Sequence, residues 1–175
     1  EYKNMNITID VTSKCNLRCK HCRVNEIGYD MKLDEIEEVF NKLTDFKPRG
    51  VFISGGEPLI RGDIVEIVKK SKKLAPVTIL NTNSLLLTEN KLKELINVGL
   101  NYIQVSVDGI EEQHDYIRGK GTYKKTIEKM KMINTYSDKI KLHISSVVSQ
   151  KNIDYMEKFA RQILEIEKIK AQILG

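Results

Sequence analysis

The sequence contains no tryptophan, only seven tyrosines and four phenylalanines, and only three cysteines and three prolines among its 175 residues. With so few aromatic side chains available to stack on bases, no nucleic-acid partner is expected. No apolar run approaches the roughly 18 residues of a membrane span, so no membrane partner is expected either. The first ten residues alternate polar and apolar side chains, unlike a signal peptide. We therefore expect a cytoplasmic protein.

The composition is that of an ordinary globular chain. Hydrophobic residues make up 41% and charged residues 30%, a balance that argues against intrinsic disorder. The net charge of +5 comes from lysines interleaved with Asp and Glu on predicted helices. That pattern is typical of solvated helical faces rather than of a basic nucleic-acid-binding surface. A chain of this length favours one domain or two small ones.

Strand-like and helix-like segments alternate along the chain. The pattern predicts six strands, at 6–12, 50–54, 77–83, 102–108, 140–149 and 170–174. It predicts five helices between them, at 33–46, 63–74, 88–97, 122–136 and 152–165. Two capping boxes are expected, Asp34 with Glu37 and Asp63 with Glu66, and Gly99 is expected to end the third helix.

This alternation implies an α/β fold with parallel strands and helices outside. A closed eight-unit barrel needs about 250 residues, so the choices are a partial barrel and an open doubly wound sheet. The strands alternate polar and apolar residues, whereas parallel strands buried on both faces are apolar throughout. The polar faces are expected to line a wet or ligand-filled interior, with simple exposure to solvent as the alternative. The residues expected to line it are Thr8, Asp10, Ser54, Asn83, Gln104, Ser106 and His143.

All three cysteines, Cys15, Cys19 and Cys22, lie within eight residues, just after the first predicted strand. The carboxyl ends of parallel strands are the ligand-binding edge of α/β proteins. Three soft thiolates on one loop suit an iron–sulfur cluster in which one of four irons stays open to another ligand. A zinc site that adds His21 is an alternative, although it is stereochemically awkward because His21 adjoins Cys22. A further alternative is three thiols without a metal, but it would not explain why the three cysteines are crowded on one loop.

Two further motifs follow the cysteines in order. Gly55-Gly56-Glu57-Pro58 ends the second predicted strand, where glycines would let the backbone approach a ligand closely. Ser106-Val107-Asp108-Gly109 ends the fourth strand, and His114-Asp115-Tyr116-Ile117-Arg118-Gly119 comes soon after it. Taken alone, the first motif reads as a plain turn. For Arg118, a surface ion pair with Asp115 or Glu112 is the alternative to a role in ligand binding.

With these motifs together, the sequence resembles the radical SAM superfamily, and within it the peptide-modifying and cofactor-maturing branch (SPASM/Twitch-like, molybdenum-cofactor-biosynthesis-like). The resemblance implies a partial TIM barrel of six βα units, open on one side. It implies a [4Fe–4S] cluster held by the three cysteines, with S-adenosylmethionine on the open iron. The residues implied to bind that nucleotide are Gly55, Gly56, Glu57, Ser106, Arg118, His21 and Asn83.

The resemblance also implies a role for several of these groups. Glu57 would accept a hydrogen bond from the methionine ammonium, and Arg118 would pair with the carboxylate. Ser106 would contact the ribose or the carboxylate, and the His21 backbone would contact adenine. Asn83 would either point at substrate or merely terminate its strand. No catalytic residue is assigned.

The activity that the resemblance implies is reductive cleavage of S-adenosylmethionine to methionine and a 5′-deoxyadenosyl radical. That radical would abstract hydrogen from a peptide or a cofactor precursor, such as one of molybdopterin or haem. A flavodoxin or ferredoxin would donate the electron. Residues 1–175 are expected to form one core domain that lacks a C-terminal extension with auxiliary clusters. The alternative is a non-catalytic, cysteine-rich zinc module for protein interaction, which would leave the glycine motif and Ser106 unexplained.

Overall fold

The computed structural model describes residues 5–24, 30–165 and 173–174. One six-stranded sheet crosses the molecule, and its strands are hydrogen-bonded side by side in chain order. All neighbouring strands are parallel. The strands are β1 (Asn6–Asp10), β2 (Gly50–Ser54), β3 (Val77–Thr82), β4 (Tyr102–Ser106), β5 (Lys141–Ser145) and β6 (Ile173–Leu174). Because a doubly wound sheet reverses its strand order at a switch point, this order identifies a partial barrel.

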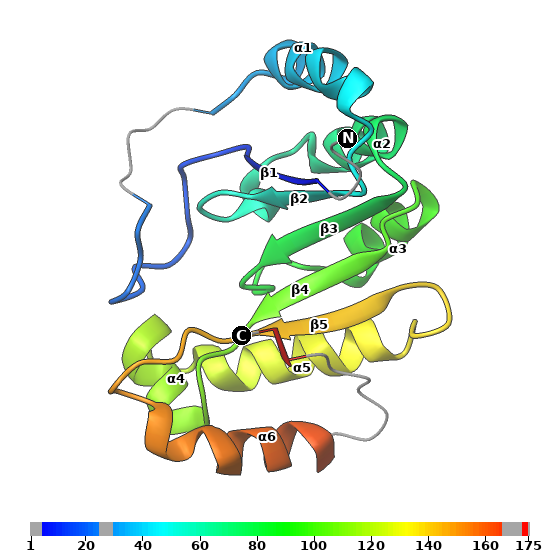
Figure 1. Cartoon of the computed structure of the whole chain (residues 1–175). Coiled ribbons are helices and arrows are strands. Elements are labelled where there is room, and N and C mark those ends of the chain that lie inside the picture. The colour runs from blue at the N-terminus through cyan, green and yellow to red at the C-terminus, as the bar shows by residue number, and fades with distance from the viewer. Residues whose placement is uncertain (1–4, 25–29, 166–172, 175) are drawn as a thin grey trace.

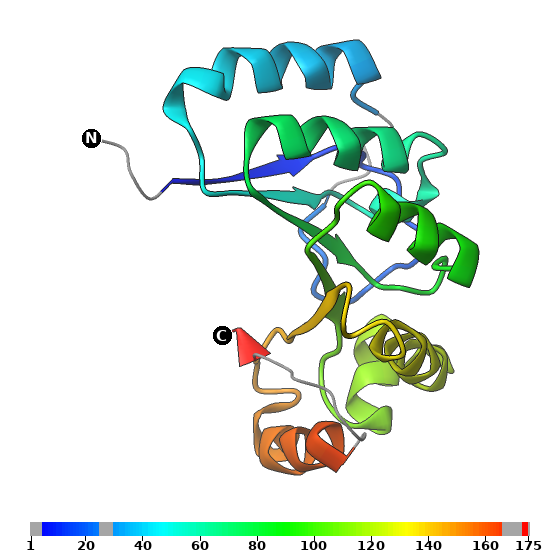
Figure 2. The ribbon, with the colours of Figure 1, turned by 90° about the vertical axis from the view of Figure 1, so that its right-hand side faces the viewer.

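The described residues form six α-helices, most of which lie on one side of the curved sheet, while its other side is open (Figures 1 and 2). They are α1 (Leu33–Leu43), α2 (Ile64–Leu74), α3 (Glu89–Asn97), α4 (Glu111–Arg118), α5 (Thr122–Asn134) and α6 (Met156–Glu165). Three short 3-10 turns accompany them, η1 (Thr44–Phe46), η2 (Pro58–Ile60) and η3 (Ile153–Tyr155). Among the described residues, no helix combines the length and the apolar character that crossing a membrane requires.

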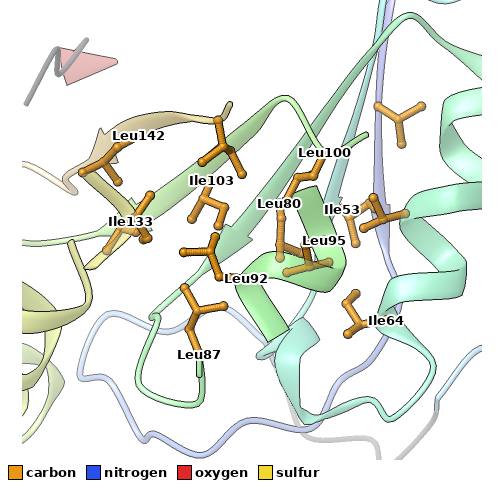
Figure 3. Close-up of a cluster of buried hydrophobic side chains, with 14 of the residues drawn as sticks. Ile53, Ile64, Leu80, Leu87, Leu92, Leu95, Leu100, Ile103, Ile133 and Leu142 are labelled. Carbon is orange, nitrogen blue, oxygen red and sulfur yellow. The ribbon is translucent and has the colours of Figure 1, made fainter. Parts of the chain in front are cut away.

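The core lies between the sheet and its helices. Every second strand residue faces this core, and Ile53, Leu80 and Ile103 are fully buried there. Figure 3 shows these side chains in one cluster with Ile64 of α2 and Leu92 of α3. Burying each such side chain contributes about 1.5–3 kcal/mol. The remaining strand residues therefore face the open, concave side, as the polar–apolar alternation predicts.

The strands end earlier than the sequence pattern predicts. The first ends at Asp10 rather than at residue 12, the fourth at Ser106 rather than at 108, and the fifth at Ser145 rather than at 149. The residues that follow leave the sheet and form the loops at its carboxyl edge. Of the predicted sixth strand, residues 173–174 are observed in the sheet, and 170–172 lie outside the described residues.

The sequence analysis missed α4, and neither of the two predicted capping boxes forms. Only Ile117 is a buried hydrophobic residue in α4, so the segment lacks the apolar periodicity that predicts a helix. At α1, the Glu35 carboxylate accepts from the Lys32 N–H at 2.7 Å, so Asp34 and Glu37 do not form the box. At α2, Asp63 is the N-cap residue but makes no side-chain cap, because its carboxylate pairs with a neighbouring arginine. The predicted end of α3 is confirmed, since Gly99 follows it with φ +91°.

Candidate functional site

The loop of residues 11–24 carries the three cysteines away from β1 and over the carboxyl edge of the sheet. Cys15 and Cys19 are half-buried and Cys22 is exposed, and all three thiols are free. All three line one cavity of about 560 Å³, which we call the cysteine cavity. Burial raises the pKa of the Cys15 and Cys19 thiols. Because metals bind the thiolate, loading a metal centre here must release protons.

The glycine motif after β2 is hydrogen-bonded to the backbone of the cysteine loop. The Gly56 N–H donates to the Thr12 carbonyl and the Glu57 N–H to the Lys14 carbonyl, each at 2.8 Å. A Cβ on Gly55 would lie 2.3 Å from the Thr12 oxygen, and one on Gly56 would lie 2.2 Å from the Lys14 oxygen. No side chain fits at either position. The two glycines therefore allow the chain after β2 to pack against the backbone of the cysteine loop. Both glycines also line the cavity.

The other flank of the loop is fastened by polar contacts that the sequence analysis did not foresee. The Thr12 hydroxyl donates to the Asp30 carboxylate, which also pairs with the Lys14 ammonium at 2.6 Å. These contacts hold the pKa of Asp30 below its usual range. The Arg61 guanidinium, whose side chain is only 8% exposed, donates to the Val11 carbonyl at 2.8 Å and pairs with Asp63. A single buried arginine thus braces the base of the cysteine loop.

Glu57 is fully buried and does not line the cysteine cavity. Its carboxylate accepts from the Thr82 hydroxyl at 2.6 Å, the Asn83 N–H at 2.7 Å and the Leu59 N–H at 3.0 Å. Burial raises the pKa of this carboxyl, and the three donors oppose that rise. The contacts join the end of β2 to the end of β3. The predicted contact with a ligand ammonium stays a prediction, and in the structure Glu57 holds Thr82 and Asn83, which line the cavity.

Asn83 lines the cavity and contacts the cysteine loop. Its Nδ2 donates to Asn16 Oδ1 at 2.8 Å and lies 4.0 Å from the Cys15 sulfur, and its Oδ1 accepts from the Leu85 N–H at 3.1 Å. The side chain is therefore already engaged with the loop that carries the cysteines. The sequence analysis left open whether Asn83 points at substrate or merely ends its strand. It did not foresee this contact with the cysteine loop.

Arg118 reaches the cavity from α4, at the carboxyl edge of the sheet. Its Nε donates to the Asp108 carboxylate at 2.6 Å, and its Nη1 lies 4.0 Å from the Cys19 sulfur. Asp108 is fully buried and also accepts from the Val147 N–H at 2.9 Å. The surface ion pair with Asp115 or Glu112 is therefore wrong, since the guanidinium turns inward to Asp108.

Further contacts connect α4 with the cysteine loop, and Figure 1 shows the two side by side. The Lys20 N–H donates to the Ile117 carbonyl at 2.9 Å, and the Lys20 ammonium lies 3.1 Å from the Tyr116 ring centroid. His21 lines the cavity with its Nε2 3.8 Å from Asp108, and burial lowers the pKa of this imidazole. The helix that the sequence analysis missed thus flanks the loop that the analysis found.

The rest of the motif around Arg118 builds the corner between α4 and α5. Asp115 accepts from the Gly121 N–H at 2.6 Å and the Tyr123 N–H at 2.8 Å, which caps the start of α5. His114 is fully buried, and its Nδ1 accepts from the Asp108 N–H at 3.3 Å. These two residues are structural, whereas Arg118 alone extends into the cavity.

Burial of His114 gives a testable pH dependence of stability. Desolvation lowers the pKa of this imidazole from its usual 6.5 to about 4. Between these values the unfolded chain binds a proton that the folded chain does not, so the free energy of unfolding decreases as the pH falls from 6.5 to 4. The expected loss is roughly 3 kcal/mol. Urea unfolding of the wild type and of His114→Gln at several pH values measures it, and equal pH slopes in both proteins would contradict it.

The structure brings together most of the predicted site. The cavity is lined by Gly55, Gly56, Ser106, Arg118, His21 and Asn83 together with the three cysteines. Glu57 is buried and hydrogen-bonded to two of the lining residues. The sequence analysis did not assign to this site the other lining residues, Arg23, Val24, Asn81, Thr82 and Val147, and it had expected Ser54 only as part of a lumen. Thr8, Asp10, Gln104 and His143, also expected in that lumen, lie on the concave face outside the cavity lining.

The donor set fits an iron–sulfur cluster. Three thiolates on one cavity are the ligands that a cubic cluster takes, with each thiolate at a different iron. Among the described residues, the cavity lining contains no carboxylate and includes Arg23 and Arg118, which favours a ligand that carries a carboxylate.

The comparisons with known proteins agree with this chemistry. Residues 9–163 match the family model of the radical SAM superfamily. The chain is 27% identical over 173 residues to the PqqA peptide cyclase of Bradyrhizobium diazoefficiens, covering 95% of this chain and 45% of that protein. It is 37% identical over 131 residues to the probable GTP 3′,8-cyclase of Methanococcus maripaludis, covering 69% of this chain and 43% of that protein.

The structure of native anSMEcpe with bound AdoMet superposes with a TM-score of 0.77 at 21% identity, over 98% of this chain and 51% of that one. The fold and the site define a partial (β/α) barrel with three cysteines on one cavity at the carboxyl edge of its strands. The chain belongs to the radical SAM superfamily, whose enzymes use a [4Fe–4S] cluster and S-adenosylmethionine. It spans less than half the length of the two curated relatives.

Proposed function

We propose that residues 1–175 form one radical SAM core domain that cleaves S-adenosylmethionine reductively and acts on a peptide or a cofactor precursor. When bound, the cluster and the nucleotide together supply one-electron cleavage of the sulfonium to methionine and a 5′-deoxyadenosyl radical that abstracts hydrogen. The single observation that carries the proposal is the position of Cys15, Cys19 and Cys22 on one cavity with the glycine motif and Arg118.

Each part of the site has a task in this proposal. The three thiolates would hold the cluster. The Nη atoms of Arg118 are free of the Asp108 contact made by Nε, so they would pair with the nucleotide's carboxylate. Ser106 and the Gly55–Gly56 backbone would hydrogen-bond the nucleotide from the strand ends. Water would have to be kept from the site during the reaction, since a carbon radical reacts with whatever lies nearest.

The partner and the compartment follow from the same chemistry. A low-potential electron carrier, a flavodoxin or a ferredoxin, would reduce the cluster. The reducing cytoplasm would keep the clustered thiols available for metal binding. The relatives include one whose name gives a peptide substrate and one whose name gives GTP, which supports both substrate classes in the proposal. A zinc module would leave the glycine motif and Ser106, which line the same cavity as the cysteines, without a role.

Anaerobic reconstitution tests the proposal. The wild-type chain should bind about four irons and four sulfides, and dithionite with S-adenosylmethionine should then yield 5′-deoxyadenosine. The Cys22→Ala variant serves as the negative control, because it removes one ligand at an exposed position without disturbing the core. Binding of zinc in a tetrahedral site with no 5′-deoxyadenosine from the wild type would refute the proposal.

A further inference from the structure

The segment that leaves β1 for the three cysteines lies beside the segment that leads into α1. Val11 and Thr12 begin the cysteine loop, and Asp30 and Met31 come shortly before α1. Thr12 and Asp30 form an isolated antiparallel bridge, and the Thr12 hydroxyl donates to the Asp30 carboxylate. We call these four residues the neck. The two sides of the neck precede and follow the three cysteines in the sequence, so the neck is where the loop is attached to the barrel.

Arg61 joins the two sides of the neck through one nitrogen. Its Nη1 donates to the Val11 carbonyl at 2.8 Å and to the Met31 carbonyl at 2.5 Å. An Nη atom carries two hydrogens, and both are used here. On the other side of the guanidinium, the Asp63 carboxylate accepts from Nε at 2.8 Å and from Nη2 at 2.6 Å. Asp63 therefore fixes the plane of the guanidinium, and the guanidinium fixes the separation of Val11 and Met31.

Arg61 holds the site together without being part of its lining. Its side chain is only 8% exposed, and it is not one of the residues that line the cysteine cavity. It follows the glycine motif in the sequence, at the end of η2. The hydrogen bonds of that motif to the cysteine loop lie just beyond Val11. Residues 56–61 therefore hold the stretch of loop between β1 and Cys15.

We propose that Arg61 is a positioning residue for the metal centre, which closes the neck and so holds the three thiols in the arrangement that the cluster requires. The inference rests on the proposed function, and it gives Arg61 no role as a ligand. A loop that is ordered before its ligand binds loses less conformational entropy on binding. Opening the neck leaves the chemistry of the thiols unchanged but holds them less firmly. The cluster then still assembles, but it is lost faster.

A purely structural role for Arg61 predicts a different result. If Arg61 contributed only to the stability of the fold, the loss of a comparable contact elsewhere would affect the cluster equally. Lys72 makes such a contact, since its ammonium donates to the Pro76 carbonyl and to Asn101 Oδ1, the latter at 2.8 Å. These bonds join α2 to the residues just before β3 and β4, and none of the three residues lines the cysteine cavity. Lys72→Met is therefore the matched control for Arg61→Met.

The rate of iron release from the reconstituted chain tests the inference. Each protein is mixed anaerobically with a ferrous iron chelator, at a temperature where circular dichroism shows every variant folded. Arg61→Met should release iron about tenfold faster than the wild type, because the charge-assisted hydrogen bonds that close the neck are lost. Arg61→Lys should also release iron faster, because its single nitrogen cannot pair with Asp63 and span both carbonyls. Lys72→Met should release iron at the wild-type rate.

The electron paramagnetic resonance spectrum of the dithionite-reduced proteins gives a second readout. Its lines should broaden in Arg61→Met and not in Lys72→Met, because thiolates that are held less firmly take a range of orientations. Equal rates of iron release in Arg61→Met and the wild type would overturn the inference. An equal acceleration in Lys72→Met would also overturn it, since the loss of any such contact would then suffice. If Arg61→Met does not fold, a wild-type rate in Arg61→Lys overturns it.

The two proposals fail separately. Cluster content and formation of 5′-deoxyadenosine by the wild type test the proposed function alone. If the wild type forms this product and the Arg61 variants release iron at the wild-type rate, the proposed function stands and the role of Arg61 is wrong. If the wild type binds no cluster, both are wrong.

Discussion

Replacing Gly56 with alanine should abolish assembly of the cluster while leaving the sheet folded. The added Cβ would lie 2.2 Å from the Lys14 carbonyl oxygen and 2.7 Å from its carbon, both backbone atoms that no rotamer change can move. The cysteine loop must therefore shift, and the hydrogen bonds from Gly56 and Glu57 to that loop are lost with it. Overpacking of this kind destabilises by about 1–3 kcal/mol. The iron content after anaerobic reconstitution measures the result.

Gly62 provides the control for this prediction. It lies a few residues further along the same loop region, and a Cβ there would meet no atom within 4 Å. The Gly62→Ala variant should reconstitute like the wild type. Circular dichroism of both variants establishes that they keep their helices. A Gly56→Ala protein with a full complement of iron would show that the loop does not depend on this close approach.

Replacing Arg118 with lysine should weaken binding of S-adenosylmethionine by about ten- to a hundredfold, because a charge-assisted hydrogen bond contributes roughly 1.5–3 kcal/mol. The arginine reaches Asp108 with Nε and keeps its Nη atoms for the cavity. Lysine has a single nitrogen, so it cannot pair with Asp108 and with a ligand carboxylate in the same fork geometry. Equilibrium dialysis of labelled S-adenosylmethionine against the reconstituted proteins measures the affinity.

Arg161→Lys is the matched substitution for this experiment. Arg161 is 73% exposed and pairs with Glu157 on the surface of α6, outside the cysteine cavity. Its replacement should leave nucleotide affinity unchanged. If Arg118→Lys binds the nucleotide as tightly as the wild type does, the carboxylate has another partner, and Arg118 serves only to neutralise the buried Asp108.

Much of the site could be predicted because its chemistry is carried by residue type and spacing. The three cysteines lie together on one loop, and no other cysteine in the chain competes for their role. Parallel strands place their carboxyl ends at one edge, so the motifs that follow β1, β2 and β4 had to converge. Six of the seven predicted nucleotide-binding residues line the cavity with the cysteines.

The roles of individual residues were less predictable, because they depend on what lies beside each one. Arg118 sits on a helix without an apolar stripe, so neither the helix nor the inward turn to Asp108 was evident. Asp63 has the spacing of a capping residue, but Arg61 takes its carboxylate. Arg61 itself belongs to no motif, and its contact with Val11 joins residues fifty positions apart.

The amino-acid sequence by itself determined the βα alternation, the polar and apolar faces of the strands and the grouping of the three thiols. These are properties of neighbouring residues, set by side-chain period and by ligand chemistry. Only the tertiary structure decided that the glycines pack against the cysteine loop, that Glu57 joins two strand ends, and that Arg118 turns inward to Asp108. Those features arise between segments distant in the chain, where the register of the sheet and the packing of loops fix which atoms meet.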